Sequence, residues 1–118
     1  KKEGAEGNEE EGNSVLNKIL VPLDSIVVNI GKVDSKRYLR VIISLEVKNS
    51  EIKGMIKKNK VIFRDKLVSF LSSKNLTELS DRANHQKLRR EIKNLLNSKV
   101  LESEDAISQV YFSDFIIQ

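Results

Sequence analysis

The sequence predicts an α+β fold in which two or three helices pack on one face of a small antiparallel or mixed β-sheet. Residues 38–48 alternate apolar and polar side chains with period two, which indicates a strand. Residues 52–73 and 84–97 instead repeat apolar side chains at helical spacing. Residues 107–117 return to the β-branched and aromatic composition that is typical of strands. The last strand is therefore expected to pair with strands formed near the beginning of the chain.

Length and composition favour one globular domain. The chain has 118 residues, of which 39% are hydrophobic and 32% charged, and aromatic residues make up only 5%. We therefore expect a core built mainly from isoleucine, leucine and valine. Residues 1–13 contain glycine, glutamate and asparagine but no large apolar side chain, so we interpret them as a flexible acidic linker. Residues 14–118 are then a single domain.

The first two strands are expected to form a β-hairpin. Residues 26–30 are rich in β-branched side chains, and turn-forming residues follow at 31–35. In residues 38–48, one face carries only aliphatic side chains, namely Leu39, Val41, Ile43, Leu45 and Val47. In the last strand, the successive polar residues Ser113 and Asp114 break the alternation and predict a β-bulge.

The two helical stretches each have one apolar side. Five residues of the first stretch fall within a narrow sector of the helix: Ile52, Ile56, Phe63, Leu67 and Phe70. The stretch is one helix or two helical pieces that meet near Asn59. The second stretch places Leu88, Ile92, Leu95 and Leu96 on one side. Residues 98–106 are predominantly polar, and we expect them to form an exposed loop.

No motif in the sequence predicts an enzyme. The absence of cysteine excludes disulfides, thiol catalysis and thiolate metal sites. His85 has no neighbouring carboxylate and nucleophile at a spacing that would build a catalytic triad, so we expect it to be a solvated residue at a helix start. The acidic clusters at 9–11 and 102–105 lie in charged stretches without a calcium-binding pattern. We therefore expect no catalytic residue, no cofactor, no metal and no small-molecule substrate.

Positive charge is concentrated in the predicted domain. Residues 1–12 hold two lysines and five glutamates, which give a net charge of −3. The whole chain has a net charge of +4, so the remaining residues carry +7. A basic body suits an acidic partner, an anionic lipid surface or nucleic acid, although such a charge is also common for solubility alone. The lysines and arginines spread around the helices without interleaved aromatic residues, so we expect no nucleic acid. A basic module that binds nucleic acid or an anionic surface stays the alternative function.

One line on the first helical stretch is a candidate interface. Val61 and Val68 are seven residues apart and lie roughly opposite Ile52 and Phe63 on a helical projection. They are expected to project away from the sheet, where two apolar side chains on one line suit a protein contact. Together with Arg64, they are the residues that we expect at an oligomer or partner interface.

The end of the chain resembles a known terminal signature. Residues 110–118 (VYFSDFIIQ) resemble the string with which proteins of the FliL family typically end. Further resemblances to that family follow in the same order along the chain: IVVNI at 26–30, RYLRV at 37–41, RD at 64–65 with LSSK at 71–74, and LS at 79–80 with LR at 88–89. The resemblance covers about residues 20–118.

Membership of the FliL family would imply a flagellar accessory protein. The resemblance implies the periplasmic domain of an inner-membrane protein at the flagellar basal body, with a stomatin/SPFH-like fold. It also implies ring-like homo-oligomers around the stator proteins, which support stator assembly, stability and torque output in motility and chemotaxis. The membrane anchor would be a transmembrane helix upstream of this chain, because no apolar run here approaches the ~20 residues that a bilayer requires. The family has no catalytic residues to assign here.

Overall fold

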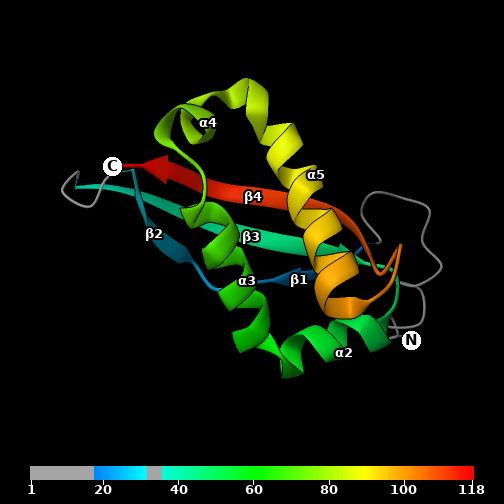
Figure 1. The fold of residues 1–118 in the computed structure, drawn as a ribbon. Coiled ribbons are helices and arrows are strands. Elements are labelled where there is room, and N and C mark those ends of the chain that lie inside the picture. The colour runs from blue at the N-terminus through cyan, green and yellow to red at the C-terminus, as the bar shows by residue number, and fades with distance from the viewer. Residues whose placement is uncertain (1–17, 32–35) are drawn as a thin grey trace.

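A computed structural model describes residues 18–31 and 36–118, which form an antiparallel sheet with helices on one face (Figure 1). The linker predicted for residues 1–13 lies outside the described residues. The strands are β1 (Ile19–Pro22), β2 (Ile26–Ile30), β3 (Arg37–Val47) and β4 (Ile107–Ile117). The predicted α+β class and the three predicted strands are confirmed, and β1 is an additional strand.

The helices fall between β3 and β4. They are α2 (Ser50–Lys58), α3 (Lys60–Ser72), α4 (Leu76–Ser80), the 3₁₀ turn η2 (Arg82–Asn84), α5 (His85–Leu95) and the π-helical segment η3 (Leu96–Leu101). In Figure 1, α3 and α5 cross the same face of the sheet, while α2 lies near the end that contains β1. The expected packing of helices on one face is therefore confirmed for the described residues.

Strand β3 is the centre of the sheet. Strands β1 and β2 pair with successive parts of one edge of β3, and β4 pairs with the other edge, all in antiparallel orientation. Between β1 and β2, the backbone N–H of Leu23 donates to the carbonyl of Ile43 at 2.9 Å, so the two short strands act as one interrupted strand. The predicted bulge in β4 is present, because the register shifts beside Asp114, which has a φ of 55°.

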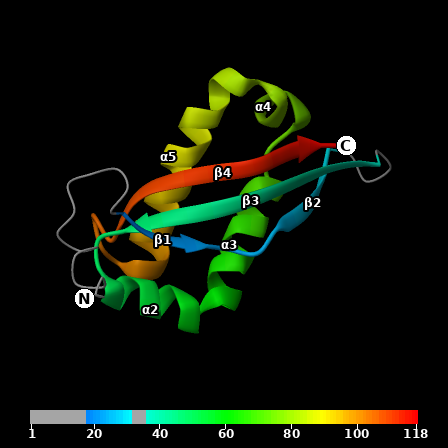
Figure 2. The ribbon, with the colours of Figure 1, turned by 180° about the vertical axis from the view of Figure 1, so that it is seen from behind.

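The alternation of β3 decides which face is buried. Leu39, Val41, Ile43 and Leu45 have no exposed surface and meet the helices, as the period-two pattern predicts. Figure 2 shows the opposite face of the sheet, over which none of the described helices lies. The domain thus has one face that forms its core and one face that the described helices leave uncovered.

Two helices, not one, cover residues 50–72. Helix α2 ends at Asn59, whose φ of −120° and ψ of 33° leave the helical region, and α3 begins directly after it. This break keeps Ile56, Phe63 and Leu67 buried on the core side although the helix direction changes. The interpretation of two helical pieces that meet near Asn59 is confirmed.

The expected exposed loop at residues 98–106 is only partly correct. Helix α5 continues as η3 to Leu101, and the loop before β4 is confined to 102–106. Asn97 is buried and binds the backbone at the start of β4, and Leu96, Val100 and Leu101 pack with the core. The polar composition of 98–106 therefore did not reveal a helical segment that tertiary contacts stabilise.

Candidate protein interface

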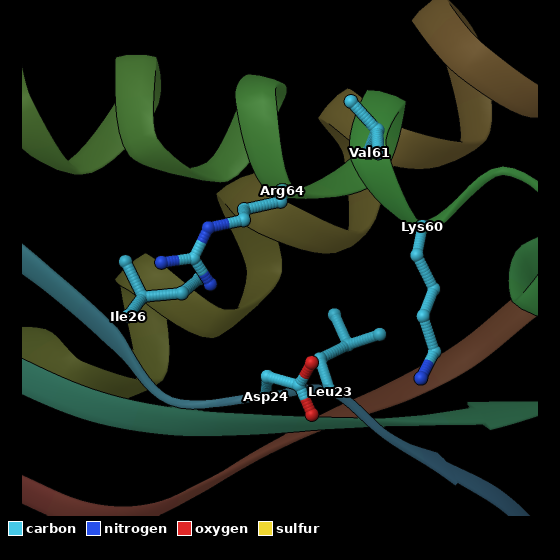
Figure 3. Close-up of a pocket in the computed structure, with 6 residues that line it drawn as sticks. All are labelled: Leu23, Asp24, Ile26, Lys60, Val61 and Arg64. Carbon is cyan, nitrogen blue, oxygen red and sulfur yellow. The ribbon is translucent and has the colours of Figure 1, made fainter.

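The first turn of α3 borders a shallow hollow at the β1–β2 edge of the sheet (Figure 3). Its floor comes from Leu23 of the segment that joins the two strands and from Ile26 at the start of β2, both of which are buried. Its wall comes from α3, where Val61 is 80% exposed. Residues that contribute charge to the hollow are Lys60 and Arg64 from α3 and Asp24 from the connecting segment. The result is an apolar floor with a mostly basic rim.

Arg64 fixes the helix over this segment. Its guanidinium donates to the backbone carbonyl of Ser25 at 3.0 Å, and Figure 3 shows the side chain reaching from α3 toward the strands. The contact joins the helix to the residue directly before β2. Arg64 therefore has a positioning role within the domain, and it also lies at the rim that a partner would approach.

The expected line of exposed residues on α3 is only half correct. Val61 is highly exposed, whereas Val68 is half-buried and packs against the hydrophobic core. The expectation that Val68 projects away from the sheet is therefore wrong. Helical periodicity fixes the angle between two side chains, but it does not fix how the helix is rolled on the sheet. Val61 and Arg64 remain together at the hollow, and Val68 supports the core.

The size of the hollow suits a protein contact better than a small molecule. Its volume is 270 Å³, which lies below the roughly 300–1,000 Å³ that is usual for ligand pockets. An apolar hollow of this size accommodates one projecting side chain of a partner. The basic rim then favours acidic groups around that side chain.

The uncovered sheet face carries exposed apolar residues that sequence reasoning did not single out. These are Leu20, Val27, Tyr38, Tyr111 and Ile116, all at least 39% exposed. The pairing places Val27 opposite Arg40 and Arg40 opposite Ile116, so apolar and basic side chains alternate across the strands. Alternation along each strand predicts which positions face away from the core, but only the strand order brings the exposed positions of different strands together.

A buried carboxylate lies on this same sheet face. Glu46 is only 6% exposed, and its oxygens accept hydrogen bonds from the hydroxyls of Ser108 at 2.7 Å and Tyr111 at 2.6 Å. Lys18 lies 3.8 Å from the carboxylate. Burial raises the pKa of Glu46, but the two hydrogen bonds and the charge of Lys18 outweigh it and hold the pKa below its usual value. The same contact with Glu46 raises the pKa of Tyr111.

Replacement of this carboxylate is expected to remove a pH-dependent part of the stability. We expect Glu46→Gln to lower the free energy of unfolding by about 1 kcal/mol at pH 7, because hydrogen bonds to an ionised acceptor become bonds to a neutral amide. A lowered folded-state pKa gives stability that is present above the usual value of 4.5 and is lost as the pH falls through the lowered value. Urea denaturation at pH 7 and pH 3 checks this, with Glu51→Gln on the exposed start of α2 as the matched control. An equal difference between wild type and variant at both pH values would contradict it.

His85 has a different environment from the expected solvated one. It begins α5 as predicted, but its ring is half-buried and stacks on Phe115 with 4.1 Å between the ring centroids. Its Nε2 lies 3.0 Å from the backbone carbonyl of Leu79. His85 thus contacts a backbone carbonyl oxygen and the rings of Phe112 and Phe115.

Within residues 18–31 and 36–118, no three histidine or acidic side chains gather in a way that would hold a metal ion. Among the helices of those ranges, none combines the length and apolar composition that crossing a membrane requires.

Comparison with known proteins gives two concordant matches. A family model described as "Flagellar basal body-associated protein FliL" matches residues 20–118. A curated relative named "Flagellar protein FliL", from Aquifex aeolicus (strain VF5), is 30% identical over 101 residues. The aligned region covers 85% of this chain and 62% of the relative, so the chain spans less than two thirds of that protein's length.

Proposed function

The chain belongs to the FliL family of flagellar basal body-associated proteins, and from this premise we propose that it is an interaction domain of the flagellar motor. In this proposal, the domain forms ring-like homo-oligomers around the stator units and supports their assembly, stability and torque output in motility and chemotaxis. The family consists of flagellar accessory proteins and is not a known enzyme family.

The proposal includes the surroundings of the domain. We place it in the periplasm, as part of an inner-membrane protein whose transmembrane helix lies outside this chain. A membrane anchor raises the effective concentration of the domains, so weak identical contacts suffice for a ring. The stomatin/SPFH-like fold belongs to the same proposal, with the packing of all described helices on one sheet face as its support.

The observation that carries the proposal is the exposed Val61 beside the apolar hollow of α3. An aliphatic side chain that is 80% exposed contributes nothing to the core, and here it extends a recess floored by Leu23 and Ile26. Arg64 holds the wall of this recess in place through Ser25. A preformed recess with an apolar floor and the exposed Val61 beside it lets a partner side chain bind at a small cost in conformational entropy.

Disruption of the hollow is expected to weaken the motor without removing flagella. We expect Val61→Glu in the full-length protein to reduce both stator occupancy and swimming in viscous medium, as deletion of the gene should. Placing a carboxylate against an apolar partner costs about 2 kcal/mol, which weakens each contact more than tenfold. Fluorescence of labelled stator units at the motor, together with swimming speed, measures the effect.

The control variant introduces the same charge elsewhere on α3. Ser69→Glu changes an exposed side chain of that helix and should leave stator occupancy and swimming unchanged. Normal motility and normal stator occupancy in the deletion strain would refute the proposed function. Normal behaviour of Val61→Glu alone would refute the assignment of this hollow as the contact.

A further inference from the structure

The outer edge of β4 presents backbone groups that point away from the sheet. In an antiparallel pair, alternate residues direct both backbone groups toward the partner strand and the next residues direct them away. Ile43 of β3 accepts a hydrogen bond from Leu23, so its backbone groups face the β1–β2 edge. Phe112 lies opposite Ile43, and its N–H and C=O therefore point outward. The same alternation applies to Val110, which lies opposite Leu45.

Asn97 already occupies the beginning of this edge in the manner of a neighbouring strand. Its amide oxygen accepts from the N–H of Ile107 at 2.8 Å, and its amide nitrogen donates to the carbonyl of Ile107 at 3.0 Å. One side chain thus satisfies both outward groups of the first residue of β4. Ile107 lies opposite Val47, and a register shift separates it from Val110, so the outward direction of Val110 and Phe112 rests on their pairing with Leu45 and Ile43. No described residue provides a corresponding cap at Val110 or Phe112.

Two adjoining hollows lie beside the uncapped part of the edge. The first has a volume of 310 Å³ and lies between Val110 and the α5 side chains Arg89, Arg90 and Lys93. The second has a volume of 570 Å³ and is lined by aromatic rings of β4 and by the beginning of α5. Arg89 belongs to both hollows, and its guanidinium lies over the ring of Phe112 at 5.4 Å. The edge is therefore flanked by a basic recess that continues into an aromatic one.

The aromatic recess has a defined lining. The rings of Phe112 and Phe115 lie 5.3 Å apart, and His85 stacks against them from α5. Arg82 and Asp114 contribute charge of opposite sign at this end. The excess of positive charge thus lies beside Val110, whereas the part beside Phe115 offers mostly apolar and aromatic surface.

We propose that the edge of β4 binds an extended acidic segment of a partner protein, which adds to the sheet as an antiparallel strand. Backbone bonds to Val110 and Phe112 supply the pairing. Acidic side chains of the added strand lie beside Arg90 and Lys93, and apolar side chains follow beside Phe112 and Phe115. Charge complementarity selects an acidic segment over a neutral or basic one. This surface is separate from the α3 hollow, so the proposal does not depend on the role given to Val61.

The test uses a designed peptide and the whole domain. A fluorescein-labelled peptide of sequence Thr-Leu-Thr-Leu-Thr-Glu-Thr-Glu matches the apolar-to-acidic order that an antiparallel strand would meet. Fluorescence anisotropy is expected to show saturable binding that weakens with salt. The leucines and glutamates are placed directly opposite the outward-pointing residues of β4, so their side chains lie on the same face of the sheet as those of Val110 and Phe112. Residues in such opposed pairs exchange backbone hydrogen bonds, so the leucine and glutamate N–H groups are those that bond to β4. N-methylation of one leucine and one glutamate should abolish binding, whereas N-methylation of two threonines should preserve it.

Charge variants separate this site from a general attraction to a basic protein. Arg90→Glu combined with Lys93→Glu should raise the dissociation constant roughly tenfold or more. Lys57→Glu combined with Lys58→Glu makes the same charge change on α2 and should alter it by less than about twofold. Val61→Glu should leave peptide binding unchanged, which keeps this test distinct from that of the α3 hollow.

Several outcomes would overturn the proposal. Equal binding of the two N-methylated peptides would exclude strand addition. Tighter binding of a thymidine decamer at the same residues would assign the surface to nucleic acid. Displacement of the probe by an equimolar peptide of residues 1–13 would make the chain's own acidic segment the occupant.

Discussion

Replacement of Phe63 by alanine is expected to lower the free energy of unfolding by about 3–5 kcal/mol. Phe63 is 1% exposed and is among the largest fully buried side chains of the described residues. Its removal forfeits the favourable free energy of transferring an aromatic ring from water into the core, and it leaves a cavity between α3 and the sheet. Urea denaturation followed by far-ultraviolet circular dichroism measures the change.

The neighbouring residue provides the control for this prediction. Ile62 is 48% exposed, and Ile62→Ala should cost less than about 1 kcal/mol. Two adjacent residues of similar hydrophobicity should thus differ several-fold in their effect, because α3 turns Phe63 toward the core and leaves Ile62 half exposed. Equal losses for the two variants would show that α3 packs with a different face.

Asn97→Ala is expected to cost about 3 kcal/mol although it removes only a small polar group. The N–H and C=O of Ile107 are both bonded to the Asn97 amide in a buried position. The alanine variant leaves both backbone groups without a partner, and each unsatisfied buried group costs about 1–3 kcal/mol. Urea denaturation gives the total, and hydrogen exchange at the Ile107 amide reports whether the loss is local.

An exposed asparagine on the same helix makes the comparison specific. Asn94→Ala should change the free energy of unfolding by less than about 0.5 kcal/mol, since the Asn94 side chain lies on the surface. Faster exchange at Ile107 should accompany only the Asn97 variant. Retention of slow exchange at Ile107 in Asn97→Ala would mean that another group caps the edge of β4.

The strands of the sheet were the most predictable part of the fold. Residues of β3 that face the core are aliphatic without exception from Leu39 to Val47, so the period-two signal is strong. The bulge beside Asp114 was predictable because two polar residues interrupt the alternation. Strand β1 was missed because it has only four residues and ends at Pro22, which makes its local signal weak.

Features that depend on tertiary packing could not be read from the pattern. The roll of α3 buries part of Val68, and no local spacing encodes that roll. Asn97 occurs in a polar stretch, and its bonds to Ile107 appear only when β4 is in place. Glu46 belongs to the polar side of β3, yet its burial requires Tyr111, which is 65 residues away in the sequence.

The candidate surfaces were predictable to a smaller extent. Val61 and Arg64 were identified from the sequence and are brought together at the α3 hollow. The uncovered sheet face and the β4 edge were not identified, because each combines side chains from segments far apart in the chain. Their recognition requires the strand order, which the sequence did not specify.

The central position of β3 also affects how the domain folds. Strand β4, which covers one of its two edges, is made some 60 residues after it, as the 62-residue separation of Glu46 and Ser108 illustrates. Closing a loop of that length lowers the chain entropy before the β3–β4 contacts form and offset the loss. We therefore expect the domain to fold more slowly than a helical bundle of the same size. Until β4 pairs with it, β3 has one unpaired edge. An unpaired edge on a long hydrophobic strand can pair with the wrong segment or with another chain. Once β4 has paired with β3, that edge is covered, so the finished sheet no longer carries this risk.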